Sequence, residues 1–188
     1  MNLFQIAMLL VSTYFAYQVY KHIHTLKDTD TKSAKYGIDD VDGLVKNADN
    51  SFLDGNYKQA SSFLQKAYAQ NQHDLEILVK LGYVMAMQDQ NEQALTYYKK
   101  ALQLEPENSS LCKKIASVYR NLKQYGKAKE LLERSIALDS TDKTTYYNYG
   151  NLLVDMNEKD KAVQMYKKAL KIDPDFKEAK NEINRVKN

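Results

Sequence analysis

Residues of similar type recur along this sequence with a period of 34 positions. Residues 97–106 read YYKKALQLEP and residues 165–174 read MYKKALKIDP, so nearly the same ten letters occur twice, 68 positions apart. The only two prolines of the chain, Pro106 and Pro174, end the two copies. Sixty-eight is twice 34, and the chain aligns without an insertion in four rows of this length that start at Val41, Leu75, Ser109 and Lys143. A constant period of this kind predicts a repeat array.

Residue size follows the columns of these rows. Small residues fill the eighth column, with Ala48, Gly82, Ala116 and Gly150, and the twentieth, with Ala60, Ala94, Ala128 and Ala162. Larger residues fill the twenty-fourth column, with Leu64, Tyr98, Leu132 and Tyr166. Within each row apolar residues recur at intervals of three and four, which predicts two short amphipathic helices, and polar turn residues separate them. Each row is therefore predicted to be a helical hairpin whose helices touch at the small residues.

These columns closely resemble the pattern of the tetratricopeptide repeat family over residues 41–176. The fourth row matches best, with Tyr146, Tyr149, Gly150, Ala162, Tyr166, Ala169 and Pro174. The resemblance implies four repeats, at 41–74, 75–108, 109–142 and 143–176. The first row departs from the pattern with Asn47 and Ser51, where apolar residues are expected. Because the outermost repeat has no earlier neighbour, a polar outer face is the expected explanation.

Residues 1–20 contain no charged side chain. As a helix, residues 3–20 would be roughly 27 Å long, close to the thickness of a bilayer core. No Lys or Arg precedes the apolar run and no small-residue cleavage site follows it, so an uncleaved transmembrane anchor is favoured over a signal peptide. A buried core helix is the alternative. Residues 21–40 are predicted to be a polar juxtamembrane tether.

The lysines near the predicted anchor all follow it, at Lys21, Lys27, Lys32 and Lys35, which predicts repeats on the cytoplasmic side of a membrane. At the other end, residues 177–188 place Ala179, Ile183 and Val186 on one stripe among charged residues, which predicts a capping helix. The predicted fold class is all-α: a right-handed, tetratricopeptide-like α-solenoid with an N-terminal transmembrane helix and a C-terminal capping helix.

The residues offer little for catalysis. The three histidines, His22, His24 and His73, do not share a repeat phase with Cys112, and no phosphate-binding glycine loop or paired metal-ligand motif occurs. Cys112 stands at the fourth column, where the family packs a large core residue, so we expect an inert buried thiol. The net charge of +3 is small and the charges are interspersed. We therefore expect no enzymatic activity, cofactor, metal, small-molecule substrate or nucleic-acid partner.

The resemblance implies a non-enzymatic, membrane-tethered adaptor that binds a peptide or helix of a partner protein in a concave groove, which the first helix of each hairpin lines. The residues implied for this groove are Phe52, Val79, Tyr83, Met87, Lys113, Arg120, Tyr147 and Asn151. Val79, Tyr83 and Met87 would give it an apolar end that needs a cover, and Lys113 and Arg120 would pair with an acidic residue of the ligand.

Two other functions remain open. The first is a structural scaffold or accessory subunit of a membrane protein complex, with or without self-association. The second is RNA binding by the related 35-residue helical repeats, against which the constant 34-residue spacing argues. A clamp for a chaperone's C-terminal carboxylate is not expected, because Val45, Val79 and Tyr83 stand at several of the positions that it needs.

Overall fold

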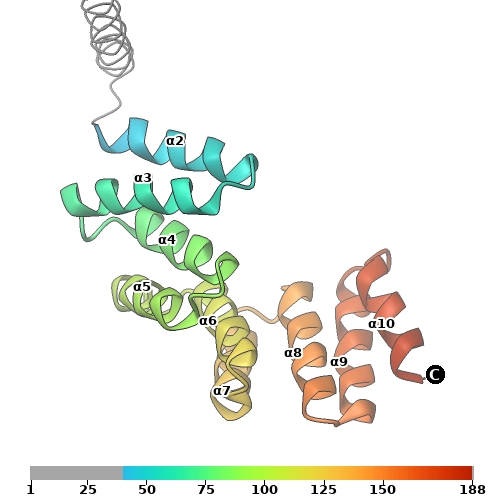
Figure 1. Ribbon diagram of the computed structural model, residues 1–188. Helices are drawn as coiled ribbons and strands as arrows, with labels where there is room; N and C mark the ends of the chain where they lie inside the picture. Colours follow the sequence, from blue (N-terminus) through green and yellow to red (C-terminus); the bar gives the residue numbers. More distant parts are fainter. Residues whose placement is uncertain (1–39, 188) are drawn as a thin grey trace, which may run out of the picture.

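The computed structural model describes residues 40–187, which form helices joined by short turns and contain no strand (Figure 1). The helices are α2 (Val41–Leu53), α3 (Tyr57–Gln70), α4 (Leu75–Met87), α5 (Asn91–Leu104), α6 (Ser109–Asn121), α7 (Tyr125–Leu138), α8 (Lys143–Asp155), α9 (Lys159–Ile172) and α10 (Lys177–Lys187). The predicted anchor at 1–20 and nearly all of the predicted tether at 21–40 lie outside the described residues. Within residues 40–187, no helix has both the length and the apolar character needed to cross a membrane.

Each row of the alignment forms one hairpin, because the same column starts every first helix. Asp40, Asp74, Asn108 and Asp142 precede α2, α4, α6 and α8, and the side chain of each accepts a hydrogen bond from a backbone N–H in the first turn. Such a cap satisfies an amide that has no partner within the helix. The repeated cap therefore fixes where each hairpin begins.

The turn inside each hairpin is also the same. The fifteenth column holds Gly55, Asp89, Lys123 and Asn157, whose φ angles are 73°, 58°, 58° and 62°. This left-handed conformation suits Gly, Asn and Asp, and it costs an ordinary side chain such as that of Lys123 about 1–2 kcal/mol. The sequence thus signals the turn in three rows, and in the third the surrounding hairpin imposes it.

The two helices of a hairpin pack closely at the predicted small residues. Ala60, Ala94, Ala128 and Ala162 are each 0% exposed. The eighth and twenty-fourth columns complement each other in volume. A Cβ atom at Gly82 would lie 2.6 Å from the ring of Tyr98, and one at Gly150 would lie 2.4 Å from the ring of Tyr166. The first and third hairpins instead pair a buried Ala with a buried Leu, at Ala48 and Leu64 and at Ala116 and Leu132.

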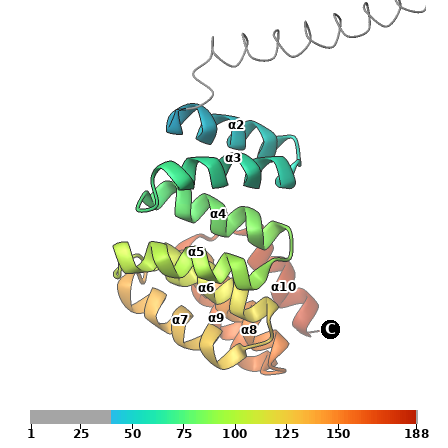
Figure 2. The same ribbon diagram turned by 60° about the vertical axis from the view of Figure 1, so that its left-hand side comes forward.

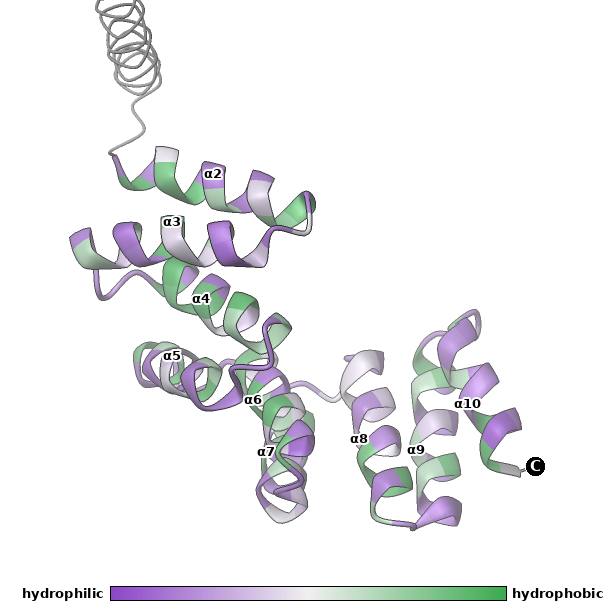
Figure 3. Cartoon of the chain, viewed as in Figure 1, coloured by the Kyte–Doolittle hydropathy of each residue, from purple (hydrophilic) through white to green (hydrophobic). Residues whose placement is uncertain are grey.

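Successive hairpins stack into a curved array (Figures 1 and 2). The first helices α6 and α8 contact each other more closely than any two second helices do within residues 40–187, so the first helices line the inner side of the curve. At the C-terminal end, α10 packs on α9 and Ala179 is fully buried. Figure 3 shows α10 as mostly hydrophilic and α4 as mostly hydrophobic. The described residues are thus an all-helical solenoid, as the sequence predicts.

Two residues singled out in the sequence are buried. Cys112 is 0% exposed, and burial raises the pKa of its thiol. Ser51 is only 7% exposed, and its hydroxyl donates a hydrogen bond of 2.8 Å to the carbonyl oxygen of Asn47. The prediction that Ser51 belongs to a polar outer face is therefore wrong. The hydroxyl is tolerated inside because it bonds back to its own helix.

Candidate partner-binding groove

The eight residues predicted for the groove all lie on first helices. They are Phe52 on α2; Val79, Tyr83 and Met87 on α4; Lys113 and Arg120 on α6; and Tyr147 and Asn151 on α8. The structure divides them into an apolar group on α2 and α4, a charged pair on α6 and a polar aromatic group on α8. These groups differ in how far their side chains are already engaged within the chain.

The apolar group leaves large side chains in solvent. Tyr83 and Met87 are each 43% exposed, and Leu53, at the end of α2, is 82% exposed. The ring of Phe52 lies 5.2 Å from the ring of Tyr83, which joins the two hairpins into one surface. Val79 is half-buried one helical turn before Tyr83. Contiguous apolar surface of this kind marks an interaction site more often than scattered exposed residues do.

Lys114 adds a charge to this surface that sequence reasoning missed. Its Nζ lies 5.6 Å from the centroid of the Tyr83 ring. Burial lowers the pKa of this amine, and the neighbouring Lys113 lowers it further. No ion pair of Lys114 occurs among the described residues. The signal that could have found it is the sixth column, which holds Lys46, Lys80 and Lys114 in three successive rows.

The charges of Lys113 and Arg120 are paired within the chain. Lys113 donates to the carboxylate of Asp142 and to the hydroxyl of Thr144. Arg120 Nε lies 2.6 Å from Asp155 Oδ2 on the next hairpin. An acidic ligand would therefore have to compete with these aspartates for the charges of Lys113 and Arg120. Pairing of Lys113 and Arg120 with a ligand therefore stays a prediction, and it carries a cost that the sequence did not reveal.

The same pairing recurs along the first helices. Lys80 pairs with Asp49 of the preceding hairpin and with Glu76, and Lys143 pairs with Asp173. Most cations on the inner side are therefore neutralised by aspartates of the chain itself. Lys114 differs from the other two cations of α6, Lys113 and Arg120, because its charge is still available to a ligand.

Asp142 joins the third and fourth hairpins through a polar network. Besides Lys113, it accepts hydrogen bonds from the backbone and hydroxyl of Thr144 and from the hydroxyl of Thr145. Partial burial raises the pKa of the Asp142 carboxyl, but these hydrogen bonds outweigh it and lower the pKa to about 2. Thr145 is fully buried, and its Oγ1 also lies within hydrogen-bond distance of the Ser135 Oγ, at 3.1 Å.

The polar aromatic group is packed against the end of the array. The ring of Tyr147 lies 5.8 Å from that of Tyr166 and 5.3 Å from that of Phe176. Asn151 accepts a hydrogen bond of 2.7 Å from the hydroxyl of Tyr166. These contacts hold α8 against α9 and its exit turn. The part of the predicted groove that is most open to a ligand is thus the apolar surface on α2 and α4 with Lys114 beside it.

The repeat pattern of the hairpins matches a known family. Sequence models described as "Tetratricopeptide repeat" match residues 75–108 and residues 106–175. The chain belongs to the tetratricopeptide repeat family. The repeats that these models match include α4 and α6, which supply the exposed tyrosine and Lys114.

Curated relatives are distant and much longer. The chain is 26% identical over 119 residues to anaphase-promoting complex subunit 3 of Schizosaccharomyces pombe, covering 63% of this chain and 18% of that protein. It is 25% identical over 123 residues to the BBSome complex member BBS4 of Mus musculus, covering 65% of this chain and 24% of that protein. The chain therefore spans less than a quarter of the length of these relatives.

Solved structures share the fold. The crystal structure of the MamA protein superposes with a TM-score of 0.67 at 24% identity, covering 78% of this chain and 80% of that one. YrrB, described as a tetratricopeptide repeat protein with an unusual peptide-binding site, superposes with a TM-score of 0.63 at 20% identity, covering 83% of this chain and 80% of that one. At these identities the likeness establishes the fold alone.

Proposed function

We propose that this protein is a non-enzymatic adaptor that binds a segment of a partner protein on the surface formed by Phe52, Leu53, Tyr83, Met87 and Lys114. We call these five residues the groove patch. The observation that carries the proposal is the exposure of Leu53, Tyr83 and Met87 on neighbouring first helices, beside a cation without an ion pair in the described chain. A ligand with apolar side chains and one carboxylate would cover the apolar area and pair with Lys114.

Family membership supports protein binding over catalysis. A protein with the same fold, YrrB, is described as having a peptide-binding site. Two relatives carry the names of subunits of large complexes, the anaphase-promoting complex and the BBSome. The second candidate function is therefore a scaffold subunit, in which the partner is a folded neighbour and the contact extends beyond the groove patch.

We further propose that the array is tethered to a membrane by residues 1–20, with the repeats on the cytoplasmic side. The support is the chargeless apolar run and the four lysines that follow it in the sequence. Deleting residues 1–20 should move the protein from the membrane fraction to the supernatant. Recovery of the full-length protein in the supernatant would refute the tether.

The groove patch is tested by crosslinking in cells. A photoreactive phenylalanine at Tyr83 should capture a partner protein, whereas the same group at Leu104 should not. Leu104 is 41% exposed, nearly as much as Tyr83, but it lies at the end of the second helix α5. Capture of the same partner from both positions would favour the scaffold over the adaptor.

Substitutions then measure the contact with the captured partner. The double change Tyr83→Ser and Met87→Ser should weaken binding at least tenfold, while Leu104→Ser and Leu138→Ser should leave it within twofold. Lys114→Gln should weaken binding less and should abolish most of its salt dependence. Unchanged circular dichroism is the control for folding. Equal losses in both double variants would contradict a groove contact.

A further inference from the structure

Basic residues gather on the second helices of the hairpins. The helices α3, α5, α7 and α9 together carry twelve Lys or Arg and four Asp or Glu, whereas α2, α4, α6 and α8 carry six and four. About half of the acidic residues at 40–187 lie in the turns rather than on the helices. The outer side of the array is therefore much more positive than its inner side.

Six of these cations form one row. The twenty-sixth column is basic in every hairpin and the twenty-fifth is basic in two, so we call the following residues the basic row: Lys66, Lys99, Lys100, Arg134, Lys167 and Lys168. All six are exposed. None of them forms an ion pair with the described part of the chain. Most inner cations, in contrast, are paired with aspartates.

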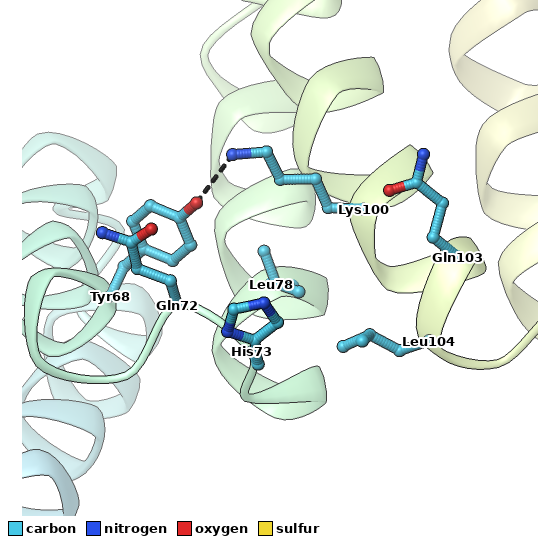
Figure 4. Close-up of a pocket in the computed structure, with 7 residues that line it drawn as sticks. All are labelled: Tyr68, Gln72, His73, Leu78, Lys100, Gln103 and Leu104. Carbon is cyan, nitrogen blue, oxygen red and sulfur yellow. Dashed lines mark hydrogen bonds between the residues drawn. The ribbon is translucent and has the colours of Figure 1, made fainter.

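The members of the basic row rest on neutral partners that leave their charge intact. The Lys100 ammonium on α5 donates a hydrogen bond of 2.7 Å to the hydroxyl of Tyr68 on α3, which is drawn as a dashed line in Figure 4. Lys99 lies 5.6 Å from the Tyr119 ring, and Lys168 lies 5.7 Å from the Tyr146 ring. Arg134 donates to the carbonyl oxygen of Pro106. The row is thus held in place without being neutralised.

We propose that the basic row is a docking surface for the anionic headgroups of a lipid bilayer. This inference rests on the proposed tether, because a polar linker of 20 residues would keep the array within about 25 Å of the membrane on average. An anionic leaflet attracts each nearby Lys or Arg strongly enough to change partitioning about fivefold. Fluid headgroups can also follow a convex row, whereas a folded acidic partner would need a matching concave face.

Two aromatic side chains strengthen the choice of lipid. Tyr68 and Tyr97 stack edge to face at 5.6 Å on the same outer side, on α3 and α5, and both are partly exposed. Tyrosine rings favour the headgroup layer. With the outer side on the membrane, the groove patch would face away from the bilayer, open to a partner.

The test uses the full-length protein with vesicles of neutral phosphatidylcholine, alone or with one-third phosphatidylglycerol. A dye on Gln65→Cys, in the basic row's column on α3, reports the outer side, and a dye on Ser117→Cys, on α6, reports the groove. The native Cys112 is buried and does not compete for the label. A headgroup-linked quencher should quench the outer dye several-fold more than the groove dye in anionic vesicles, and the difference should vanish at about 0.5 M salt.

Charge variants make the test specific. Lys66→Gln, Lys100→Gln and Lys168→Gln together should remove the preferential quenching, with docking about a hundredfold weaker from about fivefold per charge. Lys123→Gln, Lys177→Gln and Lys180→Gln remove the same charge elsewhere and should leave the quenching unchanged. Equal quenching of both dyes in anionic vesicles, or equal effects of both triple variants, would overturn the proposal. If polyglutamate, added at the same total negative charge as the vesicle lipid, displaced the protein from the vesicles, the basic row would be reassigned as a binding surface for an acidic protein.

Flotation separates this proposal from the tether. Flotation with neutral vesicles depends on residues 1–20, so its absence refutes the tether alone. If the tether is refuted in this way, flotation with anionic vesicles reports the binding of the basic row to the membrane without any contribution from residues 1–20. Salt-sensitive flotation that only the row variant loses would support the row without the tether, and its absence would refute the row as well.

Discussion

At the scale of single residues, the array is specified by pairs of columns that complement each other in volume. Gly82 and Gly150 face tyrosine rings at distances that no side-chain carbon could occupy, whereas Ala48 and Ala116 accompany leucines. The protein interior is close-packed, so the two residues of such a pair cannot be exchanged independently. The same hairpin is therefore packed in two ways, by glycine with tyrosine or by alanine with leucine.

Gly82→Ala should lower the free energy of unfolding by about 1–3 kcal/mol, because the new methyl group overlaps the Tyr98 ring. Adding Tyr98→Leu should recover part of that loss, since it recreates the pair found at Ala48 and Leu64. Urea unfolding of the two single variants and the double variant measures the coupling. Losses that simply add would show that the ring can move aside and that the columns are independent.

At the scale of elements, the junction of the third and fourth hairpins depends on ionisation. Hydrogen bonds outweigh partial burial and lower the pKa of Asp142 from 3.8 to about 2. A carboxyl whose pKa is lower in the folded state stabilises the fold above its unfolded pKa. That stability is lost as the pH falls from about 4 towards 2.

Asp142→Asn should lower the free energy of unfolding at pH 7 by about 1–3 kcal/mol, because Lys113 and two threonines lose an ionised acceptor. The difference from wild type should shrink on acidification towards pH 2. Urea titrations at several pH values check this, with the exposed Asp54→Asn as the control. A loss that is the same at every pH would mean that the carboxylate's charge plays no part.

Much of each hairpin could be predicted from spacing, because a helical period and a repeated small residue fix which side chains face one another. The buried alanines such as Ala94 and the buried Cys112 follow directly from their columns. The pairing of Arg120 with Asp155 could not be predicted in this way, since it depends on the angle between hairpins and on the reach of long side chains. The burial of Ser51 was missed because a hydroxyl can satisfy itself on its own helix.

The surroundings of the candidate groove residues could be predicted only in part. The exposure of Tyr83 and Met87 agrees with a surface that needs a cover, but the family pattern drew attention to Lys113 and Arg120 rather than to Lys114. Charge alone does not reveal which cation is free. That distinction requires the positions of the aspartates on the neighbouring hairpin.

At the scale of the whole molecule, each hairpin packs mainly on its neighbours, so stability is expected to vary along the array. The C-terminal end is closed by α10, where Ile183 and Val186 pack against the core beside the buried Ala179. A destabilising substitution in α10 should therefore lower the local stability of the C-terminal helices before that of the rest of the array.

Ile183→Asp should accelerate amide hydrogen exchange in α9 and α10 at least tenfold and leave α2 to α5 within about twofold, because a charge on this partly buried, core-facing side chain opens only the end of the stack. Hydrogen exchange followed by mass spectrometry resolves these helices. Asn184→Asp introduces the same charge on an exposed neighbour and should change neither region. Uniform acceleration along the chain would show that the array opens as one cooperative unit.

The alternation of the two hairpin types also bears on ancestry. Alanine with leucine and glycine with tyrosine follow each other in the order one, two, one, two, so in these two columns the pattern repeats every two hairpins. Duplication of a gene segment that encoded two hairpins would produce this order in one step. Four copies of one ancestral hairpin would have had to diverge twice in the same way.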